Sequence, residues 1–114
     1  MSQPRIDIVT LVNRVIEKTD ENECKWAATS TNAKYKLSLP SGSISVEYAE
    51  TINWGENYYK LEVADMSDFV YATFIGNNEN NDYYQLFQRL YKAIVDYFTR
   101  IQEEKFAKLF DDLK

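Results

Sequence analysis

Apolar side chains recur at spacings of three and four along the last third of the chain, residues 82–114. The stripe consists of Tyr83, Phe87, Leu90, Ile94, Tyr97, Phe98 and Ile101. This spacing marks one face of an α-helix, and the stretch contains no Gly or Pro. We therefore predict a long C-terminal helix, with Asp82 placed to cap its first turn after the polar loop 76–81.

The stripe changes phase after Ile101. Residues 102–105 are polar, and the next apolar residues are rotated by roughly a quarter turn, at ~3.6 residues per turn. They are Phe106, Leu109, Phe110 and Leu113. A continuous helix of about 48 Å would overhang strands that span only ~20 Å. Either the helix breaks near Gln102 and the end folds back over Phe69 and Tyr71, or the end docks on another chain. We favour a second chain, most simply in a symmetric homodimer.

A second amphipathic pattern occupies the N-terminal part of the chain, up to about Lys18. It predicts a helix that Ser2 caps, with Pro4 in the first turn. The apolar face of this helix comprises Ile8, Leu11, Val12, Val15 and Ile16.

Between the helices, apolar and polar residues alternate with the period of half-buried strands. Four strands are predicted, at 34–39, 44–48, 58–63 and 69–75, with turns at 40–43, 53–56 and 65–68. A fifth, short edge strand is an alternative for 24–28, where Trp26 is expected to plug one end of the core. If the first turn closes directly, Leu37 faces Val46 and Lys36 faces Glu47, with two further apolar pairs, Leu39 with Ile44 and Tyr35 with Tyr48.

The fourth strand is apolar on both faces. Continuing the register places Val70, Ala72 and Phe74 inward, which leaves Phe69, Tyr71 and Ile75 on the outer face. Either this chain or a second chain is expected to cover that face.

These elements predict one α+β domain over residues 1–114. Its architecture is two-layer α-β-β-β-β-α: an antiparallel meander sheet with the N-terminal helix and the long C-terminal helix on one face.

Composition and charge narrow the classes of partner. The chain has 114 residues, 45% of them hydrophobic, so it can bury a core of its own. Its formal charge of −5 argues against binding a nucleic-acid backbone. No apolar run approaches the ~20 residues of a membrane span, and no signal segment is recognised at the N-terminus. With Cys24 as the single cysteine, we expect a cytoplasmic protein, or one acting in a cell to which it is delivered.

The side chains that most enzymes use are scarce. The chain has no histidine, and none of its three glycines belongs to a phosphate-binding motif. Cys24 beside Lys25 is a candidate reactive thiol, but no base partner is identifiable, so a bystander cysteine is favoured. The pairs Asp65 with Asp68 and Glu79 with Asp82 are candidate cation ligands, but hydrogen bonding within turns explains them better. We therefore assign no catalytic, cofactor or metal residue, and expect no enzymatic activity.

Two resemblances accompany this interpretation. The four-stranded meander followed by a helix is similar in topology to PUR and whirly domains, whose sheets bind single-stranded nucleic acid by stacking. None of their motif residues can be matched here, and the net charge has the opposite sign. The strings 12–16, Lys25-Trp26 and 86–91, with the Gly-turn meander, resemble small uncharacterised bacterial and phage-borne proteins. That resemblance implies a fold and a bacterial or phage setting, and no activity.

Two functions remain open from the sequence. The first is a non-catalytic protein-interaction module, such as an immunity protein, an antitoxin or a phage-encoded inhibitor, that binds a protein partner or itself. Its partner-binding residues are expected to be Phe69, Tyr71, Ile75, Phe106, Leu109, Phe110 and Leu113. The second is a small-molecule-binding domain whose pocket, between sheet and helices, is lined by Tyr35, Tyr48 and Tyr59. An acidic mimic of nucleic acid is a variant of the first.

Overall fold

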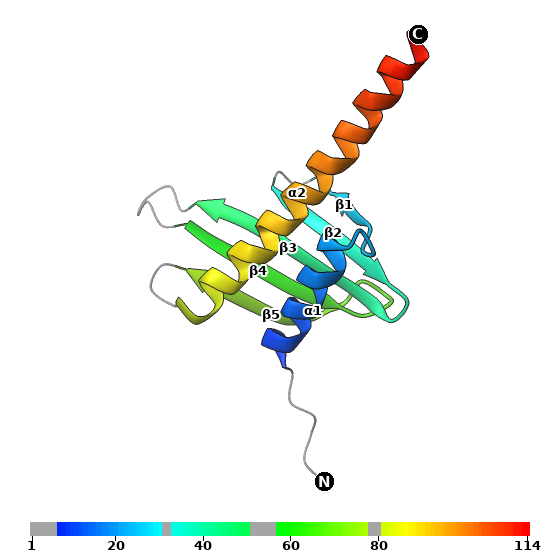
Figure 1. The fold of residues 1–114 in the computed structure, drawn as a ribbon. Helices are drawn as coiled ribbons and strands as arrows, with labels where there is room; N and C mark the ends of the chain where they lie inside the picture. Colours follow the sequence, from blue (N-terminus) through cyan, green and yellow to red (C-terminus); the bar gives the residue numbers. More distant parts are fainter. Residues whose placement is uncertain (1–6, 31–32, 51–56, 78–80) are drawn as a thin grey trace.

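The computed structural model describes residues 7–30, 33–50, 57–77 and 81–114 and shows an α+β fold (Figure 1). Two helices and five strands follow one another along the chain. They are α1 (Ile8–Asp20), β1 (Trp26–Ala28), β2 (Lys34–Leu39), β3 (Gly42–Glu50), β4 (Asn57–Ala64), β5 (Val70–Asn77) and α2 (Asn81–Asp112). The strands form one antiparallel sheet in the order β1-β2-β3-β4-β5, so each pairs with its neighbour in sequence. The predicted meander is confirmed, and the short edge strand at Trp26 is present.

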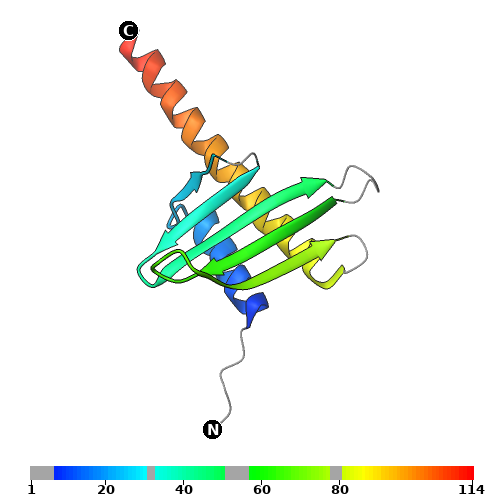
Figure 2. The same cartoon turned by 180° about the vertical axis from the view of Figure 1, so that it is seen from behind.

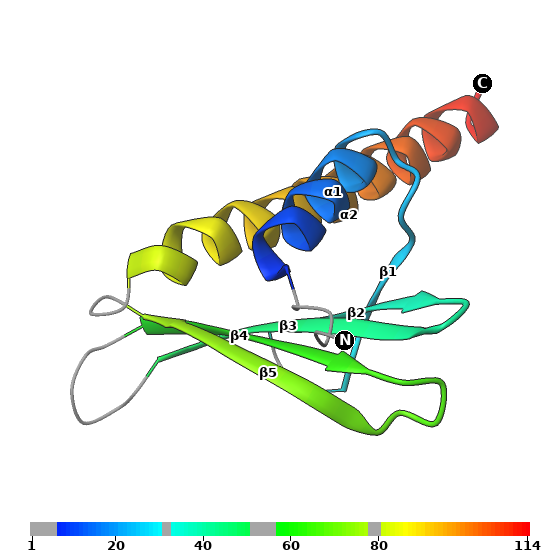
Figure 3. The same ribbon diagram turned by 90° about the horizontal axis from the view of Figure 1, so that it is seen from below.

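The molecule has two layers. Both helices lie over one face of the sheet (Figure 3), and none of the described residues forms a helix over the other face (Figure 2). Apolar residues of both layers form the core between them, and the largest that are fully buried are Phe87, Leu61, Leu90, Ile94, Val12 and Val46. Burial of a large apolar side chain contributes about 1.5–3 kcal/mol, so this layer interface is the main source of stability.

Helix α1 begins later than predicted. Asp7 is its N-cap, with a carboxylate oxygen that accepts a 3.0 Å hydrogen bond from the main-chain N–H of Thr10. This bond satisfies one of the donors left open at a helix start, which is why the helix begins at Ile8. The predicted start at Ser2 and Pro4 lies outside the described residues. The α2 helix begins at Asn81, one residue before the predicted cap Asp82, whose side chain is not among those described.

The predicted register of the first hairpin is wrong by two residues. Leu37 lies opposite Ile44, rather than Val46, and Tyr35 lies opposite Val46. Lys36 consequently faces Ser45, and it is Lys34 that faces Glu47. The reason is a tighter turn, in which only residues 40 and 41 connect the paired Leu39 and Gly42. Since side chains alternate with period two, a shift of two residues leaves every side chain on its predicted face.

Gly42 is required at this hairpin by the close approach of the next strand. A Cβ atom at this position would lie 2.1 Å from the main-chain oxygen of Ala64 in β4. The inter-strand turn at 53–56, predicted from the sequence, lies outside the described residues.

A β-bulge in β5 overturns the predicted orientation of Val70. Val63 pairs with Ala72, but Ala64 pairs with Val70, so Tyr71 is an extra residue on β5. The extra residue reverses the alternation beyond it. Ala72 and Phe74 face the helices as predicted, whereas Val70 lies on the outer face and is 41% exposed.

The two helices are joined to each other and to the sheet at defined points. Arg100 of α2 donates a 3.0 Å hydrogen bond to the main-chain oxygen of Thr19 in α1. At the other end of α2, Gly76 of β5 lies so close to the helix that a Cβ atom there would be 2.6 Å from the Tyr84 nitrogen. These contacts fix the line along which α2 crosses the sheet.

Candidate interaction surfaces

The end of α2 projects beyond the rest of the molecule (Figures 1 and 3). Ile101 is the last residue of the helix that packs against the core, and every residue from Gln102 to the end is exposed. The helix has no break near Gln102, so the fold-back over Phe69 and Tyr71 is not what the structure shows. We refer to residues 102–114 as the α2 tip.

Four large apolar side chains share one side of the α2 tip. Their exposed fractions are 65% for Phe106, 59% for Leu109, 66% for Phe110 and 83% for Leu113. Spacings of three and four place them on one face of the helix, with Leu113 in the turn that follows its last residue. We call these four residues the tip face. An apolar face of this kind, on a helix end that projects beyond the sheet, has the form of a surface for helix-to-helix docking.

Charged residues of both signs flank the tip face. At about 100° per residue, Lys105 and Asp112 lie along one border, and Glu103 lies along the other. The first border therefore carries one base and one acid, at opposite ends of the tip. Lys114 forms an ion pair with Asp111 at 3.3 Å, but both groups are at least 69% exposed, so this pair contributes little.

A second group of exposed apolar residues lies on and beside β5, the last strand of the sheet. The exposed fractions are 68% for Phe69, 60% for Tyr71 and 48% for Ile75. Val70 belongs to the same group, although the sequence predicted that it faces inward. The bulge explains the omission, because period-two alternation cannot reveal an inserted residue. The structure does not bring this group and the tip face together.

The outer face of the sheet also bears a shallow polar cleft of about 220 Å³. Its charged side chains form ion pairs: Lys34 with Glu62 at 3.2 Å, and Lys36 with Asp68 at 2.8 Å. This cleft was not predicted from the sequence; the pattern that could have indicated it is the alternation of Lys34 and Lys36 on β2. Because each lysine already has a carboxylate partner, the cleft offers no uncompensated charge to a ligand.

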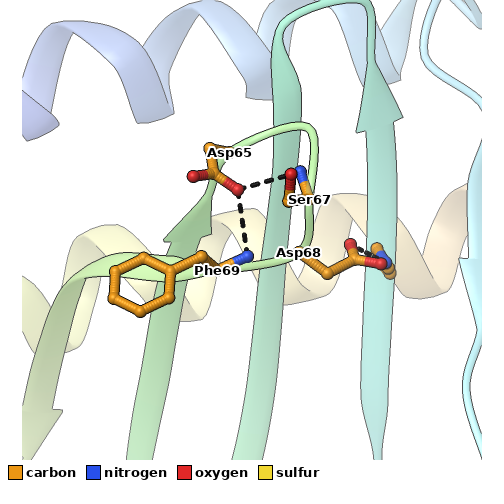
Figure 4. A network of polar contacts seen from close by, with 5 residues as sticks. Asp65, Ser67, Asp68 and Phe69 are labelled. Carbon is orange, nitrogen blue, oxygen red and sulfur yellow. Dashed lines mark hydrogen bonds and ion pairs between the residues drawn. The ribbon is translucent and has the colours of Figure 1, made fainter.

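Hydrogen bonds to the side chain of Asp65 stabilise the turn before β5. One carboxylate oxygen of Asp65 accepts hydrogen bonds from the main-chain N–H groups of Ser67, at 2.9 Å, and Phe69, at 3.0 Å (Figure 4). Asp68 points toward Lys36 instead. The two carboxylates weighed as cation ligands thus have separate structural partners, and no group of three potential metal-ligating residues occurs in the described part of the chain.

Tyrosine rings fill the space between β2–β4 and α2. Tyr35, Tyr48 and Tyr59 all pack against Tyr91 of α2, with ring centroids 5.6–5.9 Å apart. Burial raises the pKa of Tyr91 to about 12, and the neighbouring Tyr35 hydroxyl adds to the effect. Burial likewise raises the pKa of Tyr59. The three tyrosines therefore lie together between sheet and helix, as predicted. Their rings pack against Tyr91 and fill the space that a ligand pocket would need.

Cys24 has the environment of a structural thiol. Its side chain is buried, and burial raises its pKa, which is opposite to the change that activates a thiolate. None of the helices whose residues are described is long and apolar enough to cross a bilayer.

A comparison of the chain with protein-family models, curated proteins and solved structures finds no match.

Proposed function

We propose that this chain is a non-catalytic protein-interaction module that acts as a symmetric dimer through the α2 tip. The observation that carries the proposal is the tip face: four large apolar side chains, each 59–83% exposed, on a helix end that projects beyond the sheet. A symmetric dimer is the simplest assembly that covers the same surface on both copies.

The apolar content of the tip is sufficient for association. Burial of a Leu or Phe side chain contributes about 1.5–3 kcal/mol, and a dimer buries two copies of Phe106, Leu109, Phe110 and Leu113. The loss of translational and rotational freedom costs roughly 4–15 kcal/mol. Even when these side chains are only partly covered, the gain is of the size that the cost requires.

The charges beside the tip face are compatible with an antiparallel arrangement. In an antiparallel pair related by a twofold axis, each border of one helix meets the same border of its partner. With the axis between Lys108 and Leu109, Lys105 lies opposite Asp112 of the partner subunit. A parallel pair in register would instead bring each border against the other border of its partner, with Lys105 near Glu103 of the partner subunit.

The interior supports this proposal over a small-molecule site. A ligand between sheet and helices would need a cavity lined by Tyr35, Tyr48 and Tyr59. Those rings are in contact with Tyr91 at the centroid distances given above, so a ligand there would have to displace them.

The distribution of reactive groups supports a non-catalytic role. The sequence has no histidine, Cys24 is buried, and the lysines of the outer cleft are paired with acids. Small bacterial or phage-borne inhibitors, antitoxins and immunity proteins work in this way, by surface contact, and we place the protein in this class.

Disulfide cross-linking tests the proposed dimer. In a Cys24→Ala background, Leu109→Cys places a thiol next to the twofold axis, where two Cα atoms can come within the ~7 Å that a disulfide requires. Mild oxidation is expected to give a covalent dimer on a non-reducing gel.

Leu113→Cys is the matched control on the same face. In the antiparallel dimer its two copies lie about 13 Å apart, at ~1.5 Å per residue, so it should remain monomeric on the gel. Cross-linking at both positions would show a parallel pair, and failure of Leu109→Cys to cross-link would contradict docking through the tip face.

A further inference from the structure

Strand β5 leaves one side of the sheet open. It is the last strand in the order, and among the described residues no segment pairs with it on the side away from β4. In an antiparallel sheet, every second residue of such a strand directs its main-chain N–H and C=O away from the neighbouring strand. These groups form a ready template for one more strand.

The β5 edge lacks the sequence features that usually prevent pairing with a further strand. The strand is eight residues long and contains no Lys, Arg, Asp, Glu or Pro. Its bulge lies at Tyr71, near the start, so residues 72–76 keep a regular register against β4. Natural edge strands are typically short, charged, interrupted by Pro, or covered.

The opposite edge of the same sheet is protected by its length. Strand β1 has three residues, and Lys25 directly precedes it. The two edges therefore differ: β1 offers at most one or two pairing positions, whereas β5 offers a continuous run. Apolar Ile75, 48% exposed on the outer face, adds a side-chain contact beside that run.

We propose that the β5 edge binds an extended segment of a partner protein, which adds a sixth antiparallel or parallel strand to the sheet. The main-chain groups that residues 72–76 direct away from β4 determine the conformation of the occupant, since only an extended chain presents N–H and C=O groups at matching intervals. The segment should carry apolar or β-branched residues on both faces, to lie beside Ile75 on one face and Phe74 on the other.

The occupant is a different protein rather than a second copy of this chain. Pairing of β5 with itself would add a second twofold interface to that of the α2 tip. Two such interfaces on one chain enlarge the assembly into a tetramer or an open array. A strand from another protein leaves the dimer closed and gives it two equivalent partner sites.

The inference rests on the proposed interaction function. The addition of a strand does not itself require the dimer, which bears only on the choice of occupant. It is tested with the full chain and a capped peptide of alternating valine and threonine, with a lysine at each end and the length of β5. Amide hydrogen exchange resolved by residue is the readout. In the presence of saturating peptide, amides within residues 72–76 are expected to exchange several-fold more slowly, and those of β1 to be unchanged.

Variants of the two edges provide the control. Thr73→Lys with Ile75→Lys introduces charge on β5 and should abolish the protection, while Ala27→Lys on the exposed edge of β1 should leave it intact. Thermal melting shows whether the β5 variant is folded. If it is not, the inference is judged by whether the peptide protects residues 72–76 in the unaltered chain.

Phe106→Glu with Phe110→Glu separates this inference from the dimer. Protection of β5 in that variant supports edge pairing even if the α2 tip does not self-associate. Protection confined to β1 or the α2 tip, no protection anywhere, or equal protection in a folded Thr73→Lys/Ile75→Lys variant would overturn the inference.

Discussion

The indole Nε1 of Trp26 donates a 2.9 Å hydrogen bond to Oγ1 of Thr19, and both side chains are buried. The same Thr19 hydroxyl donates to the main-chain oxygen of Val15, at 2.7 Å. One hydroxyl thus joins the C-terminal turn of α1 to the edge strand β1 and satisfies the indole where water cannot reach it. We infer that this bond positions α1 against the end of the sheet, beside the point where Arg100 anchors α2.

Thr19→Val tests that relationship. Valine keeps the shape of the side chain but leaves the buried indole N–H without an acceptor, which costs about 1–3 kcal/mol. We expect the free energy of unfolding in urea to fall by that amount. Thr99→Val is the control, because Thr99 makes the same bond to a residue four positions earlier, Val95, on an exposed surface. A loss for Thr19→Val no larger than for Thr99→Val would contradict the role assigned to the Trp26 bond.

Gly76→Ala tests the close approach of α2 to the sheet. The added Cβ would lie 2.6 Å from main-chain atoms of Tyr83 and Tyr84, so the helix would have to move. We expect a loss of about 1–3 kcal/mol, the usual cost of overpacking, measured by chemical denaturation. Thr73→Ala, at an exposed position of the same strand, should change the free energy of unfolding by less than about 0.5 kcal/mol. Equal effects of the two substitutions would show that the helix is not held at this distance.

The tyrosine cluster should make the protein sensitive to alkaline pH. Burial raises the pKa of Tyr91 from 10.0 to about 12, so the unfolded chain releases this proton at lower pH than the folded protein does. The stability that the group contributes is therefore intact below pH 10 and is lost as the pH rises toward 12. Denaturation midpoints should fall over this window, and Tyr91→Phe should reduce the fall. Tyr71→Phe, at an exposed position, should leave it unchanged; an equally steep fall in Tyr91→Phe would refute the assignment.

Sequence patterns predicted the layers of this fold better than its details. Apolar spacing was enough to identify both helices and the faces of the strands, because burial acts on every residue of those patterns. The hairpin register and the orientation of Val70 were missed for a different reason. A two-residue turn and a one-residue bulge are set by main-chain geometry, and neither changes the local alternation by which strands are recognised.

The candidate surfaces were predictable to different extents. The change of phase after Ile101 identified the tip face, since a helix longer than its sheet must leave residues uncovered. Phe69, Tyr71 and Ile75 were identified from apolar residues on both faces of one strand. The open edge of β5 was not foreseen, because strand order, and hence which strand lies at the edge, depends on pairing across the whole sheet.

Charge reversal tests the antiparallel orientation of the proposed dimer. Lys105→Glu would place two acids opposite each other at both symmetric positions, and Asp112→Lys would place two bases there. Exposed pairs contribute ~0.2–1 kcal/mol each and the dimer has two, so each single reversal should raise the dimer Kd by about two- to thirtyfold. Combining Lys105→Glu with Asp112→Lys should restore the Kd at low salt. A double variant that associates more weakly than either single variant would contradict this pairing.

Sedimentation equilibrium over a range of micromolar concentrations measures self-association through the α2 tip most directly. The unaltered chain should sediment with twice the mass of the 13.4 kDa chain. Phe106→Glu with Phe110→Glu should sediment as a folded monomer, whereas Lys108→Glu, which changes the net charge equally on the opposite side of the helix, should remain dimeric. An unaltered chain that stays monomeric at high micromolar concentration would contradict the account.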